Sequence, residues 1–298
     1  METTRPVPKE AVLIVNTRSR RGQKLFRHAV VKLEAAGIKL TGKHSIRRPD
    51  RDLIRTMHEA VRGGTPMVIV GGGDGSLSCT VDEVVDRDCV FALLPLGTAN
   101  SFARTLGIPV DLDGAVQTIA TGKRRRIDVG AIDGDYFANA SSIGLSPMIG
   151  QTIPHKLKRY LGRPGYLLWS LWCLARFHSF RLTVEGPHGS ETLRALEVRI
   201  ANGSFHGGIE VVEDASVESG DIVVEAVSGR ARTTLIMNWL RLLLGLPKKE
   251  REVRQFRGRS LRLITEPPLP ISIDGEVLAR TPVTASIAER AIEVVVPA

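Results

Sequence analysis

The chain has 298 residues, of which 43% are hydrophobic, and it carries a formal net charge of +9 at pH 7. This length and composition are enough for a sizeable buried core, and the absence of about 18 uninterrupted apolar residues argues against a membrane-spanning helix. The charge favours anionic partners. Only 5% of the residues are aromatic and no helix-turn-helix, zinc-finger or ribonucleoprotein motif is present, so we expect no nucleic acid among these partners.

The first part of the chain alternates between strand and helix patterns. Apolar runs predict strands at 11–16, 38–46, 67–71 and 90–95. Amphipathic patterns predict helices at 23–36, 50–62, 77–86 and 111–121, the last with Asp111 as its N-cap. Such alternation with short connections is typical of a doubly wound α/β domain with a parallel sheet, which we place at residues 1–127.

From about residue 128 the pattern changes to short runs rich in valine, isoleucine and leucine, separated by frequent turns. These runs predict strands at 136–144, 180–186, 194–201, 221–227, 259–265 and 270–274. Two helical stretches interrupt them, at 165–177 and 232–245. We therefore expect a mostly antiparallel β domain over residues 128–290.

The sequence Gly71-Gly72-Gly73-Asp74-Gly75-Ser76 follows an apolar strand pattern and precedes a helical one. Glycines let backbone N–H groups approach a polyphosphate, and the start of a helix favours negative charge. Asp74 would repel a phosphate unless a divalent cation such as Mg²⁺ lay between them. The loop therefore indicates a nucleotide–metal site, and the alternative is a glycine-rich turn with a helix-capping aspartate.

A second polar loop, Pro95-Leu96-Gly97-Thr98-Ala99-Asn100-Ser101, follows the next predicted strand and leads into a short helix. In parallel α/β sheets, ligands bind outside the carboxyl ends of the strands. Two such loops, one strand–helix unit apart, can therefore face the same ligand.

Together these loops resemble those of the diacylglycerol kinase catalytic family, in particular its bacterial soluble lipid kinases. The resemblance extends along most of the chain, through segments 15–22, 126–130, 139–144, 201–203 and 273–276, the last reading Ile-Asp-Gly-Glu. Five positions depart from the family pattern. Ser101 and Ser219 stand where the family usually has aspartates, Thr17 and Arg20 replace its usual proline and glycine, and Ser76 replaces its usual threonine. The order of the segments, more than the first loop alone, separates this pattern from those of NAD kinases and phosphofructokinases.

The resemblance implies an α/β nucleotide-binding domain followed by a β-sandwich that contacts the lipid, with residues 291–298 returning to the first domain. It also implies an ATP-dependent lipid kinase that phosphorylates a hydroxyl of a lipid such as diacylglycerol, giving phosphatidic acid. A kinase for a sphingoid or other lipid alcohol stays open as an alternative, as does a catalytically inactive regulator that binds nucleotide or lipid.

Phosphoryl transfer needs bound phosphates, charge neutralisation and a base near the acceptor hydroxyl. Candidate nucleotide-binding residues are Asn16, Ser19, Ser45, Gly72, Gly73, Asp74, Gly75, Ser76, Thr98 and Asn100. Candidate Mg²⁺ ligands are Asp74, Asp128, Glu218 and Asp221. Asp274 and Glu276 are candidate bases, alongside Asp74 as a catalytic carboxylate; on spacing alone, Asp274-Gly275-Glu276 is equally compatible with a tight turn between strands.

Basic residues at 155–160 precede an apolar aromatic stretch at 166–172, a combination that suits a lipid headgroup interface. The alternative is a core helix beside a solvated basic run. Three cysteines without metal-type spacing are typical of a reduced, cytoplasmic protein. We therefore expect a cytoplasmic enzyme that binds peripherally to the inner face of the membrane, where it meets its lipid alcohol, with a homodimer possible in principle.

Overall fold

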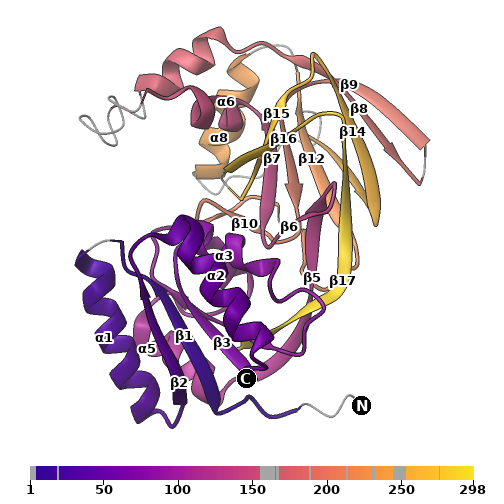
Figure 1. The fold of residues 1–298 in the computed structure, drawn as a ribbon. Coiled ribbons are helices and arrows are strands. Elements are labelled where there is room, and N and C mark those ends of the chain that lie inside the picture. Colours follow the sequence, from indigo (N-terminus) through magenta and orange to yellow (C-terminus); the bar gives the residue numbers. More distant parts are fainter. Residues whose placement is uncertain are drawn as a thin grey trace.

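The computed structural model describes the whole chain except residues 1–4, 19, 155–164, 166–167, 188, 213, 230–231, 244–252 and 275. Most of its strands belong to one mixed sheet of 15 strands, parallel in the first part of the chain and largely antiparallel in the second. Figure 1 shows the two parts one above the other, with helices around the parallel strands below and the antiparallel strands above. The predicted fold class is confirmed.

The first part contains four neighbouring parallel strands in the order β2-β1-β3-β4. The strands are β1 (Glu10–Asn16), β2 (Lys39–Ile46), β3 (Met67–Gly72) and β4 (Val90–Pro95). The helices are α1 (Arg20–Ala35), α2 (Pro49–Arg62), α3 (Asp74–Val81), α4 (Ser101–Thr105) and α5 (Leu112–Thr121). Helix α1 packs against α5, and α2 packs against α3 on the face turned to the viewer in Figure 1.

The ends of these helices follow local chemistry. Asp111 caps α5 as predicted, because its side chain accepts a hydrogen bond from the backbone of Gly114. The prediction of a helix at 77–86 was wrong at both ends. The helix α3 begins at Asp74, directly after Gly73, whose extended backbone ends the strand, and it ends at Val81. Asp74 is tolerated in the first turn because a carboxylate interacts favourably with a helix N-terminus.

The second part is built mainly from antiparallel strands, with a few helices beside them. Its strands are β5 (Lys123–Ile132), β6 (Asp135–Phe137), β7 (Ala140–Gly144), β8 (Phe180–Gly186), β9 (Gly189–Ala201), β10 (Phe205–His206), β11 (Ile209–Glu210), β12 (Ile222–Ser228), β13 (Val253–Gly258), β14 (Ser260–Glu266), β15 (Pro270–Ile273), β16 (Glu276–Arg280) and β17 (Val283–Val296). Its helices are α6 (Leu145–Thr152) and α8 (Arg232–Leu243), and residues 168–176 are also helical.

The long strand β17 joins the two parts. Its first residues pair with β14, whereas Glu293 and Val294 pair in parallel with β4, so the chain end lies beside the parallel strands. Strand β5 pairs with β17 along most of its length. The domain boundary that we predict at 127/128 falls inside β5 and stays a prediction, since the sheet continues through this point.

Ile292 tests how strongly this crossing strand supports the fold, because its side chain is fully buried in the core around the parallel strands. We expect Ile292→Ala to lower the free energy of unfolding by about 2 to 5 kcal/mol, through lost burial and a new cavity. Urea denaturation followed by circular dichroism measures this change. Val31→Ala on the surface of α1, where Val31 is 66% exposed, is the control and should change stability by less than about 0.5 kcal/mol.

Candidate functional site

Strands β1, β3 and β4 are neighbours and parallel, so their carboxyl ends lie at one edge of the sheet. A cavity of about 280 Å³ opens at this edge. It is lined by Asn16, Arg18, Gly22, Leu25, Gly72, Gly73 and Leu96. The structure therefore brings together the loops after β1, β3 and β4, as expected from the sequence.

The two glycine loops touch each other directly. A Cβ atom on Gly97 would lie 2.5 Å from the Cα of Gly73 and 2.8 Å from Oδ1 of Asn100. A Cβ atom on Gly72 would lie 2.5 Å from the Cβ of Ser76. These separations are too short for real Cβ contacts. Packing therefore requires glycine at both positions, between the two loops at Gly97 and within the first loop at Gly72.

The predicted polar residues of this edge are held in different ways. Nδ2 of Asn16 donates to Oγ of Ser76 at 2.8 Å. Ser45 and the buried Thr17 are joined through their hydroxyl oxygens at 2.8 Å, between the ends of β2 and β1. These contacts fix the first loop against the start of α3.

In the second loop, Thr98 is exposed and Asn100 is buried. Oδ1 of Asn100 accepts from the N–H of Gly97 at 2.9 Å, and its Nδ2 donates to the oxygen of Gly97 at 3.1 Å. Asn100 also has a left-handed backbone, with φ of 50°, immediately before α4. Its side chain thus braces the loop in this structure, and a direct contact with nucleotide stays a prediction.

Asp74 lies in the first turn of α3 and is half-buried. Its Oδ1 accepts a hydrogen bond from the backbone N–H of Phe102 in α4 at 3.2 Å. This bond ties together the helices that follow the two glycine loops, and it leaves a carboxylate beside the predicted phosphate position.

The Asp274 carboxylate comes from the second part of the chain and reaches α3. Its Oδ2 accepts from Oγ of Ser78 at 2.6 Å and from the N–H of Ala138 at 3.0 Å, and its Oδ1 accepts from the N–H of Ala140 at 3.2 Å. Burial raises the pKa of this carboxyl, and the three hydrogen bonds oppose that rise. The predicted meeting of the Asp-Gly-Glu segment with the glycine-loop helix is therefore present for Asp274.

Ser78 is not among the site residues predicted from the sequence. Asp74 and Ser78 are four residues apart on α3, and Asp82 follows at the same interval as the C-cap, so the three lie on one side of the helix. Helix α3 also packs against β6. Burial also raises the pKa of Asp82, and the nearby charges of Asp135, Glu83 and Asp274 add to the rise. The four-residue spacing of polar side chains is the signal that could have identified this face.

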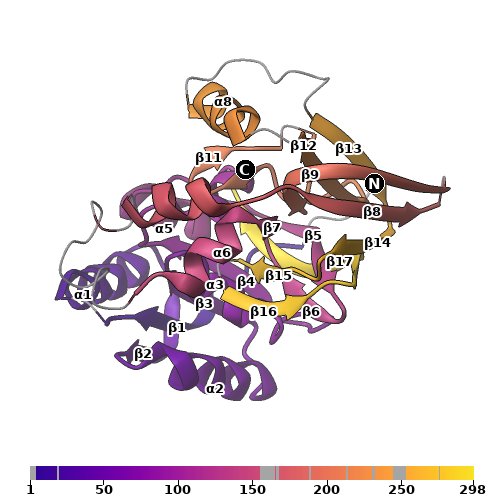
Figure 2. The same ribbon diagram turned by 90° about the horizontal axis from the view of Figure 1, so that it is seen from above.

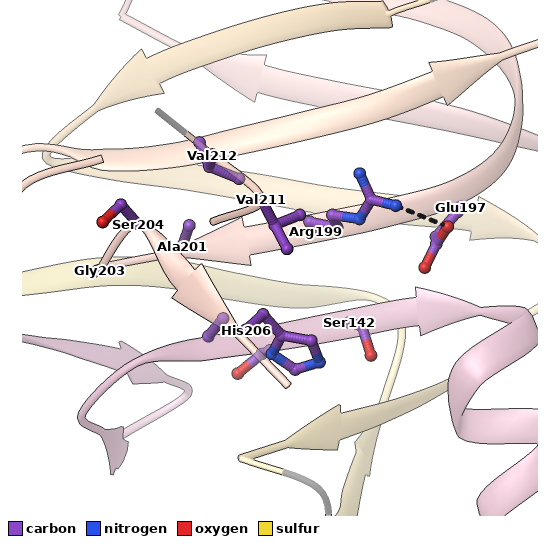
Figure 3. A pocket seen from close by; sticks show the side chains of 11 residues that line it. Ser142, Glu197, Arg199, Ala201, Gly203, Ser204, His206, Val211 and Val212 are labelled. Atoms are coloured by element: carbon purple, nitrogen blue, oxygen red, sulfur yellow. Dashed lines mark hydrogen bonds and ion pairs between the residues drawn. The ribbon is translucent and has the colours of Figure 1, made fainter. Parts of the chain in front are cut away.

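His206 is a second residue that the sequence analysis missed. Burial lowers its pKa, whereas the charges of Asp274, Glu197 and Asp74 oppose this change. Figure 3 shows His206 beside Ser142, with Arg199 and Glu197 across the same pocket. The cavity volume is only about 10 Å³, roughly the room that one water needs. No sequence signal distinguishes this lone histidine.

Three buried charged side chains line or support this small cavity. Arg199 on β9 donates to Glu225 on β12 at 3.0 Å and to Glu197 at 3.1 Å. A buried guanidinium between two carboxylates satisfies charges that would otherwise be costly to bury. The group thus fixes β9 against β12 behind the site.

The other predicted metal ligands are held by protein groups. Both oxygens of the buried Asp128 accept backbone N–H groups at 2.8 Å, from Gly220 and from Arg290. Glu218 pairs with Arg125 at 3.1 Å. Asp221 lies at the end of the same loop and donates its N–H to Oγ of Ser219 at 3.4 Å.

Within the described ranges, no group of three or more histidine, cysteine, aspartate or glutamate side chains could hold a metal ion. A metal site built from Asp128, Glu218 and Asp221 therefore stays a prediction. Ser19, Gly275 and the side chain of Glu276 lie outside the described part of the structure, and so do the basic residues 155–160.

Comparison with known proteins identifies similar proteins over nearly all of the chain. Residues 10–132 match the diacylglycerol kinase catalytic domain, and residues 140–296 match the YegS C-terminal NAD kinase beta sandwich-like domain. A Pseudomonas aeruginosa protein (strain UCBPP-PA14) named "Probable lipid kinase YegS-like" is 30% identical over 294 residues, which cover 97% of this chain and 95% of that protein. A diacylglycerol kinase of Staphylococcus aureus (strain JH9) is 27% identical over 300 residues, covering 97% and 93% of the two chains.

The fold is shared with solved structures. The crystal structure of a diacylglycerol kinase from Bacillus anthracis strain Sterne superimposes with a TM-score of 0.76 at 20% identity and covers 97% of both chains. The family predicted from the sequence is confirmed. The chain belongs to the bacterial diacylglycerol kinase and YegS-like family, and it is a lipid kinase, a phosphotransferase.

Proposed function

We propose that this lipid kinase transfers the γ-phosphoryl group of ATP to the hydroxyl of diacylglycerol and so forms phosphatidic acid. The observation that carries the proposal is the 2.6 Å hydrogen bond from Ser78 to Asp274. It places an acidic residue of the second part beside the helix that begins at the glycine loop. A reaction between a bound triphosphate and an acceptor hydroxyl needs these two elements together.

The cavity at the parallel edge supports ATP as the phosphoryl donor. Backbone N–H groups at Gly72 and Gly73 and the N-terminus of α3 favour bound phosphates. Asp74 fits the donor set of Mg²⁺, which in such sites takes one or two carboxylates and completes its shell with phosphate oxygens and water. When bound, Mg²⁺ would neutralise phosphate charge, and Asp74 would hold it through its carboxylate.

For the acceptor side, Asp274 and Glu276 are the two proposed bases. The raised pKa of Asp274 suits a group that must receive a proton, because a more basic carboxylate binds it more tightly. Its contacts with Ser78, Ala138 and Ala140 orient it. Glu276 follows two residues later, at the start of β16.

The acceptor could instead be a sphingoid or another lipid alcohol. A regulator without catalysis is the other alternative, since Ser101 replaces a carboxylate usual in the family. Oγ of Ser101 accepts the N–H of Gly208 at 3.0 Å, so this serine supports the contact between α4 and the β10–β11 turn. The proposal of activity rests on Asp74 and Asp274, which are both present.

We also propose that the enzyme meets its substrate as a peripheral protein on the cytoplasmic face of the membrane. Leu168, Leu171 and Trp172 are exposed on the helix at 168–176, and Ile236 and Met237 are exposed on α8. Figure 1 shows both helices at the same end of the molecule, away from the parallel strands. Exposed apolar side chains suit the boundary between headgroups and acyl chains. In the described part of the chain, no helix has the length and apolar character needed to cross a bilayer.

The catalytic proposal predicts that Asp74→Asn and Asp274→Asn each reduce phosphoryl transfer at least about 100-fold while the fold persists, because each removes a charge that the reaction uses. Radiolabelled ATP and a lipid extract measure transfer, and the mass of the product identifies the acceptor. Asp113→Asn, at an exposed carboxylate on α5, is the control and should keep wild-type activity. Full activity in both active-site variants would rule the mechanism out, and a sphingoid phosphate as the product would select the alternative acceptor.

The packing between the glycine loops predicts a loss of ATP affinity in Gly97→Ala. The added methyl group would overlap the Cα of Gly73 and push the two loops apart. We expect ATP to bind at least about tenfold more weakly, since misplaced donors lose charge-assisted bonds to phosphate. Isothermal titration calorimetry gives the affinity, and circular dichroism checks that the variant is folded. An unchanged dissociation constant would mean that ATP binding does not depend on the contact between the two glycine loops.

The proposed membrane face predicts that Leu171→Glu weakens binding to anionic vesicles, because a charged side chain would have to enter the interface. Vesicle co-sedimentation measures the bound fraction, which should fall several-fold. Val31→Glu introduces the same charge at an exposed valine on α1 and serves as the control. If both variants lost the same fraction of vesicle binding, the added negative charge alone would explain the loss, and the proposed membrane face would be wrong.

A further inference from the structure

Each helix that follows a glycine loop offers one serine hydroxyl to a turn of the second part. On α3, Ser78 donates to Oδ2 of Asp274 at 2.6 Å. On α4, Ser101 accepts from the N–H of Gly208 at 3.0 Å. Both contacts run from a helix of the first part to a turn of the second part. They differ in chemistry, since one partner is a carboxylate and the other is a neutral backbone amide.

We propose that Ser78 is a positioning residue for phosphoryl transfer, which holds the Asp274 carboxylate in register with the helix that begins at Asp74. This inference rests on the proposed function. It assigns to Ser78 a role that acts through Asp274 and not by contact with ATP.

The geometry supports a directed bond. An ionised carboxylate can only accept hydrogen bonds, so the Ser78 hydroxyl must be the donor when Asp274 is charged. A separation of 2.6 Å is typical of a charge-assisted O–H···O⁻ bond. Ser78 lies four residues after Asp74, one helical turn along α3, so a rigid element relates the two carboxylates.

The other two donors to Asp274 belong to its own part of the molecule. Ala140 is the first residue of β7 and Ala138 lies two residues before it, and β15, which precedes Asp274, pairs with β7. Asp274 itself has a left-handed backbone with φ of 45°, a conformation that needs support from its surroundings. Among the contacts of the described residues, Ser78 supplies the donor from the first part, so its bond depends on how the two parts meet.

The Ser78 bond also has a defined electrostatic consequence. Burial raises the pKa of Asp274, and the Ser78 hydroxyl lowers it by stabilising the charged form. Removal of the hydroxyl should therefore raise this pKa further. If Asp274 must be ionised for the reaction, removing the Ser78 hydroxyl moves the acidic limb of the pH–rate profile to higher pH. A purely structural loss would reduce the rate without this movement.

The test compares Ser78→Ala, Ser78→Thr and Ser101→Ala in the full-length enzyme, with kcat/KM for lipid phosphorylation measured across pH. We expect Ser78→Ala to lower kcat/KM about tenfold or more and to move the acidic limb to higher pH, because a bond to a charged group is lost. Ser78→Thr keeps a hydroxyl and should restore the wild-type limb. Ser101→Ala removes the matched contact without touching a carboxylate, so its limb should stay at the wild-type pH.

A second measurement does not depend on activity. Folded protein holds a proton on Asp274 at higher pH than the unfolded chain, so the free energy of unfolding falls as pH rises from the unfolded pKa through the folded pKa. In Ser78→Ala this fall in the free energy of unfolding should extend to higher pH. In the Asp274→Asn variant, adding Ser78→Ala should leave the pH dependence of the free energy of unfolding unchanged. Urea unfolding across this range detects both results.

The outcomes separate the two proposals. Absence of lipid phosphorylation by the wild-type enzyme would overturn the proposed function, while the unfolding data would still decide whether Ser78 sets the charge of Asp274. An active enzyme in which Ser78→Ala leaves the acidic limb unmoved, or in which Ser101→Ala moves it equally, would overturn the role of Ser78.

Discussion

The carboxylate of Asp274 joins the two parts of this lipid kinase at the candidate site. It accepts one hydrogen bond from α3 and two from the backbone near β7. A buried carboxylate is costly unless donors surround it, so these bonds are a condition for keeping the side chain at the junction. Burial raises the pKa of Asp274, and the same bonds that hold the carboxylate in place oppose that rise.

The sheet determines where this carboxylate lies. Strand β15 pairs with β7 so that Ile273 is opposite Ser141, and the backbone N–H of the next residue, Asp274, donates to the backbone oxygen of Ala140 at 3.2 Å. Figure 2, which views the molecule from above, shows β15 beside β16, its antiparallel partner. Asp274 follows β15 directly and reaches Ser78 on α3 through its side chain. A one-residue slip of β15 would turn the buried isoleucines outward, so the apolar pattern of this short strand fixes the register.

Much of the first part could be predicted from sequence because its signals are local. Runs of buried aliphatic residues followed by glycine and polar residues mark the ends of β3 and β4, and parallel pairing brings those ends to one edge. The start of α3 escaped prediction because glycine in a helical turn is unfavourable on propensity alone. Here the favourable position of Asp74 at the helix start, and the packing of the loops, outweigh that cost.

The missed features depend on contacts between distant residues. Ser78 and Asp274 are 196 positions apart, and no local pattern links them. The pKa of His206 depends on its burial and on charged residues of other elements. Strands β13 and β16 and helix α6 were also absent from the sequence prediction, since their short, partly polar segments have weak periodicity. Asn100 is a further example, because its side-chain amide hydrogen-bonds to Gly97 in its own loop and the sequence does not reveal this contact.

The crossing of β17 into the parallel strands has a consequence for dissecting this enzyme. A fragment ending after β5 would leave the outer edge of β4 without its natural neighbour, since Glu293 and Val294 cover that edge in the intact chain. Bare edges of hydrophobic strands recruit strands from other molecules. The first part of the chain is thus unsuited to isolation by simple truncation, and a soluble minimal version would need the terminal strand grafted back beside β4.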